Sequence, residues 1–167
     1  MNFAVTMTAA FLLSACPALA QEKSDPALTR LVGSWVGQGQ MLGEEANYKA
    51  EAEMVLDGSF LLLSLTDASE PPQYDSRIFI GRSKERGDYV AHWLDTTGAD
   101  GARVVGFGDG NEDHLTLTFH YEGSDFRDTF EFQTDGSFKL VVDRQGDDGR
   151  WQAFARYVFT PSASASK

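Results

Sequence analysis

Short apolar segments with a period of two follow one another between Trp35 and Thr160, at intervals of about ten residues. In residues 48–56, apolar side chains occupy every second position, and Lys49, Glu51 and Glu53 lie between them. A period of two places the apolar side chains on one face of a β-strand and the charged ones on the other. Gly, Asp and Asn residues, which favour tight turns, separate the segments. The pattern predicts an all-β domain of antiparallel strands joined by hairpins.

The turn residues divide this region into about ten expected strands. They cover residues 33–41, 48–56, 60–66, 74–82, 88–95, 102–109, 114–121, 126–133, 137–144 and 150–160. One short helix is expected over residues 27–32, with Asp25 as its N-cap and Pro26 in its first turn. Closing the first strand on the last would pair both edges of the sheet. We therefore expect a closed antiparallel up-and-down β-barrel of about ten strands with a short N-terminal helix.

The first twenty residues have the composition of a signal peptide. They contain no Asp, Glu, Lys or Arg, and residues 3–15 are almost entirely apolar. Such a segment is too short to span a bilayer and is typical of the apolar region of an export signal. Cleavage after Ala20 fits the small-residue rule, because Ala18 and Ala20 lie at the required spacing. Residues 13–16 also look like a lipobox, in which Cys16 would be acylated, so both processing routes stay open.

The resulting organisation has four parts. We expect a signal peptide over residues 1–20, a linker and short helix over 21–32, the β-barrel over 33–160 and a flexible tail over 161–167. The export signal predicts a periplasmic or secreted protein. If Cys16 is acylated instead, the barrel is a membrane-anchored lipoprotein held by a short tether.

The formal net charge of −11 at pH 7 falls entirely after residue 20. An acidic surface repels nucleic-acid phosphates and anionic lipid head groups, so no nucleic-acid partner is expected, and membrane attachment is expected only through Cys16. Because Cys16 is the one cysteine in the chain, no intramolecular disulfide can form. The stability of the domain must come from its core, and the sequence does not indicate an oligomeric state.

Residues 33–39, Gly-Ser-Trp-Val-Gly-Gln-Gly, resemble the G-x-W-x-G-x-G opening strand of nitrobindin-like and other lipocalin-like barrels. His92-Trp93 with Asp95, residues 126–130 (Phe-Arg-Asp-Thr-Phe) and residues 148–151 (Asp-Gly-Arg-Trp) look like the later strands of an uncharacterised bacterial lipocalin-like family related to that group. Together these segments span most of residues 33–160. The resemblance implies a small calycin-type barrel with a central cavity, and it implies no particular activity.

Nitrobindins hold ferric haem through a histidine near the C-terminal end of the barrel. The corresponding segment of this chain, residues 150–160, contains no histidine. Haem is therefore not expected from the resemblance, and no other cofactor is expected. His114 and His120 alternate with Thr116 and Thr118 on the expected solvent face, so no metal site is expected either.

A ligand held in such a cavity would contact aromatic walls and a few polar anchors. The candidate ligand-binding residues are Trp35, Arg77, His92, Trp93, Arg127, Asp128 and Arg156. Each has a structural alternative, since tryptophans pack in cores, strand arginines pair with carboxylates on the outer face, and a strand histidine can bond structurally. Asp128 shares a face with Phe126 and Phe130, so an inward position would require a partner or make its protonation important.

Three functions fit these observations. The first is an exported barrel that binds a small apolar or amphipathic molecule in its central cavity. The second is an isomerase- or cyclase-type enzyme that uses the same cavity, with His92 or Asp128 transferring a proton. The third is an envelope-tethered interaction lipoprotein that acts through its rim loops. The sequence contains no established catalytic motif, so we expect the binding protein, and an interior packed solid with aromatic rings would remove the basis for it.

Overall fold

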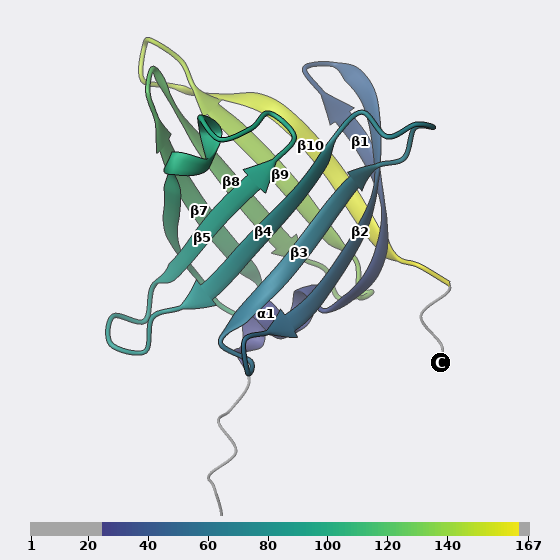
Figure 1. The fold of residues 1–167 in the computed structure, drawn as a ribbon, viewed down its shortest axis with the longest axis vertical. Coiled ribbons are helices and arrows are strands. Elements are labelled where there is room, and N and C mark those ends of the chain that lie inside the picture. The colour runs from purple at the N-terminus through teal and green to yellow at the C-terminus, as the bar shows by residue number, and fades with distance from the viewer. Residues whose placement is uncertain (1–24, 164–167) are drawn as a thin grey trace, which may run out of the picture.

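Ten antiparallel strands close on themselves to form a barrel (Figure 1). The computed structural model of the chain describes residues 25–163. The strands are β1 Gly33–Met41, β2 Glu44–Val55, β3 Phe60–Asp67, β4 Asp75–Arg82, β5 Tyr89–Asp95, β6 Val105–Gly110, β7 His114–Tyr121, β8 Ser124–Phe132, β9 Phe138–Gln145 and β10 Trp151–Pro161. Each strand pairs with its neighbours in the sequence, and β1 pairs with β10. The fold class expected from the alternating pattern is confirmed.

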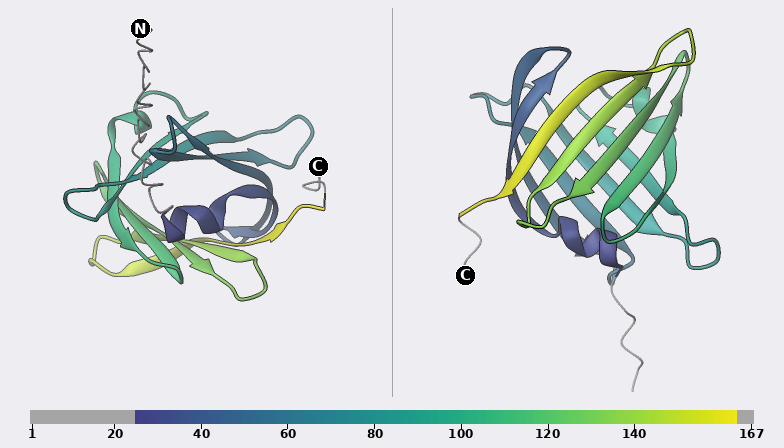
Figure 2. Two further views of the ribbon diagram at one scale, coloured as in Figure 1. Left: turned by 90° about the horizontal axis from the view of Figure 1, so that it is seen from below. Right: turned by 180° about the vertical axis from the view of Figure 1, so that it is seen from behind.

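The short helix α1, Pro26–Leu31, lies across one end of the barrel (Figure 2, left). We call this end the closed end. The Leu28 N–H donates to the Asp25 side chain at 3.0 Å, and Pro26 opens the first turn, where its missing N–H costs nothing. Leu28 and Leu31 are at most 2% exposed, because they point into the barrel and seal it. The helix therefore forms where the capping residues predicted it.

Asp25 also connects the helix to the barrel wall. Its carboxylate accepts a hydrogen bond from the Tyr89 hydroxyl at 2.8 Å and lies 3.3 Å from the Arg82 guanidinium. We expect Asp25→Ala to lower the free energy of unfolding by about 2 kcal/mol, because the helix loses its cap and the buried Tyr89 hydroxyl loses its acceptor. Urea unfolding followed by circular dichroism measures this, with the exposed hairpin substitution Asp147→Ala as the matched control. Equal stability of the two variants would contradict the role of Asp25.

Two glycines of β1 allow β10 to lie close against it and close the barrel. Gly37 pairs with Phe159 and Gly39 with Tyr157. A Cβ atom added at Gly37 would lie 2.3 Å from the Phe159 ring, and one added at Gly39 would lie 2.0 Å from the backbone oxygen of Arg156. Any larger residue at either position would force the strands or rings apart.

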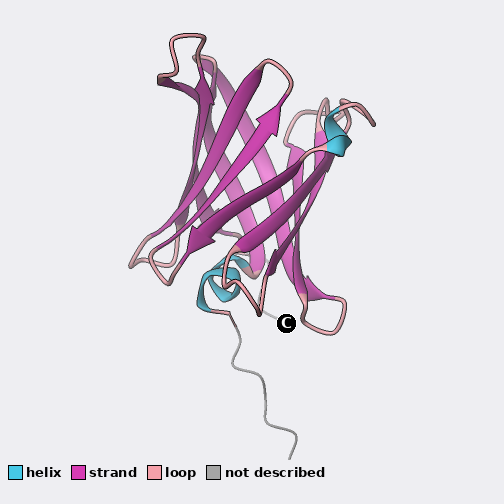
Figure 3. Cartoon of the chain, turned by 90° about the vertical axis from the view of Figure 1, so that its left-hand side faces the viewer, coloured by secondary structure: helices cyan, strands magenta, loops and turns pink. Residues whose placement is uncertain are grey.

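The connections after β1, β3, β5, β7 and β9 lie at the end opposite α1, which we call the open end (Figures 1 and 3). Both ends of the described chain lie at the closed end. The helix begins there, and β10 finishes there beside β1, with Pro161 opposite Trp35. The two ends of the barrel therefore differ, because one is covered by a helix and the other only by hairpins.

The structure departs from several expected boundaries. Strand β2 begins at Glu44 instead of residue 48, and β8 begins at Ser124 instead of residue 126. Strand β6 begins at Val105 instead of residue 102, because Gly101–Arg103 form a 3-10 turn, η1. Strand β10 continues to Pro161, and the Ser162 N–H donates to the Ser34 carbonyl at 2.8 Å. The expected signal peptide, Cys16 and residues 164–167 lie outside the described residues. Within residues 25–163, no helix has the length and apolar character needed to cross a membrane.

Candidate functional site

The inner face of the barrel is filled with aromatic rings at the closed end. The Phe138 ring stacks on Phe159 at 4.7 Å between centroids, and Trp35 meets Phe138 edge-on at 4.9 Å. All three side chains are at most 6% exposed. The Trp35 Nε1 donates to the Leu31 carbonyl at 2.9 Å, which connects β1 to α1. This half of the barrel is a packed core of the kind that excludes a bound ligand.

The rings at the open end are exposed to a greater degree. We call them the open-end cluster, and its members are Tyr48, Tyr74, Trp93, Tyr121, Phe126, Phe154 and Tyr157. All are partly exposed except Tyr157, which is 7% exposed. The Tyr48 ring stands nearly perpendicular to Tyr74, at 87°, and to Tyr157, at 83°. Solvent therefore reaches six rings of this cluster, whereas at the closed end Trp35, Phe138 and Phe159 are buried and Phe132 is partly exposed.

A chain of hydrogen bonds joins Trp93, Tyr74 and Asp95 at the open end. The Trp93 Nε1 donates to the Tyr74 hydroxyl at 3.0 Å, and that hydroxyl donates to Asp95 Oδ2 at 3.0 Å. Burial raises the pKa of Tyr74, and the charge of Asp95 raises it further. Burial likewise raises the pKa of Tyr48 and of Tyr157, so these phenols stay neutral at physiological pH and act as hydrogen-bonding groups.

Asp128 is the one buried carboxyl group whose pKa is raised among residues 25–163. It lies on the inner face of β8 between Phe126 and Phe130, is 4% exposed, and has Leu117 and Val142 as cross-strand neighbours. Within residues 25–163, no hydrogen-bond donor or cation acts on its carboxyl group. Burial raises its pKa to about 7, and the charge of Asp143 on the other side of the wall adds to the rise. The site therefore holds an acid that exchanges a proton near neutral pH.

Ser76 is a second buried polar group on the inner face. Its Oγ makes no hydrogen bond of normal geometry with residues 25–163. The Ser76 Oγ is close enough to the Tyr74 hydroxyl to lower the pKa of Tyr74 slightly, against the larger rise caused by burial. Buried polar atoms without partners are uncommon, and they are candidates for contact with a ligand.

Two of the candidate arginines, Arg127 and Arg156, lie on the outer face. The Arg127 guanidinium stacks over Trp151 at 4.4 Å from the ring centroid and lies 3.1 Å from an Asp143 oxygen. Arg156 forms a hydrogen-bonded ion pair with the second oxygen of Asp143. The three charged groups form a ladder across β8, β9 and β10, which is the structural alternative considered for these arginines.

Arg77 and His92 also lie on the outer face. Arg77 is exposed and pairs with Asp75 at 2.6 Å. The His92 Nε2 lies 2.7 Å from the Ala102 carbonyl in the connection that contains η1, so the imidazole holds this loop against β5. Of the candidate residues, Trp93 lies on the inner face at the open end, Asp128 lies on the inner face midway along β8, and Trp35 is part of the packed core. Ligand binding by any of them stays a prediction.

Four tyrosines of the site were not selected from the sequence. They are Tyr48, Tyr74, Tyr121 and Tyr157. Their alternation with polar residues shows which face of a strand they occupy, but not their depth along the barrel. The direction of each strand indicates this depth. Because α1 marks the closed end, successive strands run alternately away from that end and back toward it. Tyr48 and Tyr121 fall at the open end by this rule.

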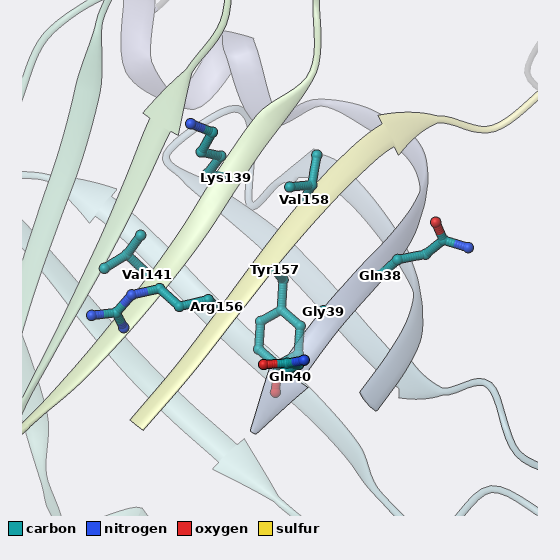
Figure 4. Close-up of a pocket in the computed structure, with 8 residues that line it drawn as sticks. All are labelled: Gln38, Gly39, Gln40, Lys139, Val141, Arg156, Tyr157 and Val158. Carbon is teal, nitrogen blue, oxygen red and sulfur yellow. The ribbon is translucent and has the colours of Figure 1, made fainter. Parts of the chain in front are cut away.

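Two grooves lie on the outside of the barrel. The larger, of about 470 Å³, runs over β1, β9 and β10 and is lined by Gln38, Gly39, Gln40, Lys139, Val141, Arg156, Tyr157 and Val158 (Figure 4). The other, of about 400 Å³, lies between α1 and the connections after β6 and β8. The one arginine that lines the larger groove, Arg156, is already paired with Asp143. Among residues 25–163, the buried polar groups without a normal hydrogen bond or an ion pair, Ser76 and Asp128, lie on the inner face instead.

The fold and the site define a small closed all-β barrel, plugged at one end by its N-terminal helix and open to solvent at an aromatic, acidic other end. The chain belongs to the DUF1579 family, described as proteins of unknown function, whose sequence profile matches residues 21–160. The match covers the helix and all but the last residue of the barrel. A search of curated proteins found no match to this chain.

Proposed function

We propose that this protein is an exported, lipocalin-like barrel that binds one small apolar or amphipathic molecule at its open end. The observation that carries the proposal is the contrast between the two ends of the inner face. Trp35, Phe138 and Phe159 at the closed end are packed against one another and buried, whereas every ring of the open-end cluster except Tyr157 is partly exposed. A ligand seated on the cluster would remove aromatic surface from water, and each buried aromatic side chain contributes about 1.5–3 kcal/mol.

The site also provides the polar contacts that orient a ligand. Neutral tyrosine hydroxyls, the Ser76 Oγ and the Asp128 carboxyl group lie among the rings or beside them. Ligand sites in proteins combine such apolar walls with a few placed polar groups. The export part of the proposal rests on the signal-peptide pattern of residues 1–20. The lipocalin-like part rests on the barrel and on the motif of residues 33–39.

A matched pair of substitutions tests the location of the site. Phe154 lies in the open-end cluster, 5.2 Å from Phe126, while Phe107 lies on the outer face and is 47% exposed. We expect Phe154→Ala to weaken binding of the neutral fluorescent probe N-phenyl-1-naphthylamine about tenfold, which equals about 1.4 kcal/mol. Phe107→Ala should leave the affinity unchanged. Fluorescence titration at fixed protein concentration gives both dissociation constants.

The proposal fails if the parent protein does not bind the probe, or if both substitutions weaken binding equally. An effect of Phe107→Ala alone would move the interaction to the outside of the barrel. That result would favour the envelope-tethered interaction protein, for which mass spectrometry of the native protein would then be expected to find an acylated Cys16.

One observation favours a second candidate, an isomerase- or cyclase-type enzyme. A carboxyl group with a pKa of about 7 in an apolar site is suited to general acid–base chemistry. The two candidates differ in their effect on a ligand extracted from protein purified from its host. An enzyme that moves a proton through Asp128 would introduce deuterium into the ligand's C–H bonds in D₂O, and Asp128→Asn would abolish this exchange. A binding protein returns the ligand without deuterium in those bonds.

A further inference from the structure

We propose that the open end binds a small apolar cation, of the quaternary ammonium or hydrophobic amine class, with Asp128 as its counter-ion. This inference rests on the proposed function, because it names the chemistry of the molecule bound at the same site. Three observations support the inference: the negative charge of the inner face, the aromatic rings of the open-end cluster, and the lack of a partner for Asp128.

The charges on the inner face at this end are mainly negative. Asp95 and Asp128 occupy inner-face positions of β5 and β8. Arg144, opposite Phe126, is the one strand arginine or lysine among residues 25–163 whose register places it on the inner face here. Its side chain is exposed at the rim, and its Nε donates to the Ser124 Oγ at 3.1 Å. An anionic ligand would therefore meet two carboxylates, while a cationic one would meet complementary charge.

The rings of the open-end cluster suit a cation with little hydration. The face of an aromatic ring carries negative potential and attracts ammonium groups, most strongly for Trp and Tyr. The cluster contains Trp93 and four tyrosines, and the Tyr48 ring is perpendicular to two neighbours. Rings at right angles present walls on more than one side of a bound group. Quaternary ammonium ions are held by such walls without needing hydrogen-bond acceptors.

Asp128 lacks the partner that a buried carboxylate needs. A buried charge must be paired or neutralised, and no residue between 25 and 163 supplies a cation or a hydrogen-bond donor to this group. A metal ion would require several ligands together, and among those residues no three His, Cys, Asp or Glu side chains are grouped closely enough to hold one. An organic cation needs only one carboxylate and apolar walls, which the open end provides.

The protonation of Asp128 couples cation binding to pH. Asp143 on the far side of β9 and Tyr121 on β7 interact electrostatically with Asp128, and Asp95 on β5 acts in turn on Tyr121. Burial and the two aspartates raise the pKa of Tyr121, so this phenol stays neutral. A bound cation favours the ionised form of Asp128, so its affinity must rise as pH increases through about 7. Binding should release about 0.5 proton per molecule at pH 7.

The test uses two probes of the same shape, phenyltrimethylammonium and tert-butylbenzene, which differ by a charged nitrogen in place of a carbon. Each displaces N-phenyl-1-naphthylamine from the parent protein in a fluorescence titration at pH 5.5 and pH 8.5. We expect the cation to bind at least about tenfold more tightly than the neutral probe at pH 8.5, and this preference to fall about tenfold at pH 5.5. Calorimetry in phosphate and in Tris measures the proton release.

Asp128→Asn should lower the affinity of the cation to that of the neutral probe at pH 8.5 and remove the proton release. The matched control Glu51→Gln removes the same charge from the exposed outer face of β2 and should keep the preference intact. Equal or tighter binding of tert-butylbenzene, or a preference that survives Asp128→Asn, overturns the inference while leaving the proposed function standing. If no probe binds at either pH, the proposed function itself fails.

Discussion

Asp128→Asn is expected to make the protein progressively more stable than the parent as pH rises from 4 to 8. Burial raises the pKa of Asp128 from 3.8 to about 7, so the folded protein holds this proton more tightly than the unfolded chain. Its stabilising contribution is complete below about pH 4 and is lost as pH rises through 7. This rise in the pKa of Asp128 from 3.8 to about 7 corresponds to about 4 kcal/mol. Asparagine cannot ionise, so the variant should not lose this energy.

Urea unfolding of parent and variant at several pH values gives the difference directly. Taking the difference cancels the opposite pH dependence of exposed carboxylates such as Asp67 and Asp75, whose pKa values are lowered by hydrogen bonds. Glu51→Gln serves as the control, because it removes an exposed charge and should produce no pH-dependent gain. A difference between Asp128→Asn and parent that is constant from pH 4 to pH 8 would show that Asp128 has an ordinary pKa.

Trp35→Ala is expected to lower the free energy of unfolding by about 4 kcal/mol. The side chain is 6% exposed, packs edge-on against Phe138 and donates to the Leu31 carbonyl. Removing it leaves a cavity beneath α1 and a buried carbonyl without its donor, and the surrounding strands cannot collapse into the space because they are held in a closed barrel. The helix should therefore loosen from the barrel.

Trp151→Ala is the matched control for this substitution. Trp151 lies on the outer face, where it supports the Arg127 guanidinium, and its loss should lower stability by only about 1 kcal/mol. Urea unfolding measures both effects, and hydrogen exchange of the α1 amides reports the loosening of the helix. If the two variants lose similar amounts of unfolding free energy, Trp35 is not part of a packed core that differs from the outer face of the barrel.

The fold was predictable because a period of two and regular turn residues leave few alternatives. The expected bounds 33–41 and 114–121 are those of β1 and β7. The start of β6 was not predicted, because the residues of η1 make a local turn with a backbone bond from Val104 to Gly101 that the hydrophobic pattern does not reveal. At this position the local hydrogen bond, and not the alternation of apolar and polar residues, determines the backbone conformation.

The site was predictable only in part. Alternation correctly grouped Asp128 with the inward phenylalanines, because residues two apart share a face. It does not say how deep in the barrel a residue lies, so Trp35 and Trp93 look equivalent in sequence but occupy opposite ends. That Arg127 and Arg156 share Asp143 depends on the cross-strand register, in which Arg127 lies opposite Asp143 and Arg156 opposite Val141.

Both ends of the described chain lie at the closed end, beside α1. Anything joined to either end of the described chain is therefore attached at the closed end. A fusion partner, a surface for immobilisation or an anchor placed ahead of residue 25 would be attached at the plugged face. The aromatic rim would then point away from the attachment, with its five hairpins unobstructed and accessible to molecules arriving from the surrounding medium.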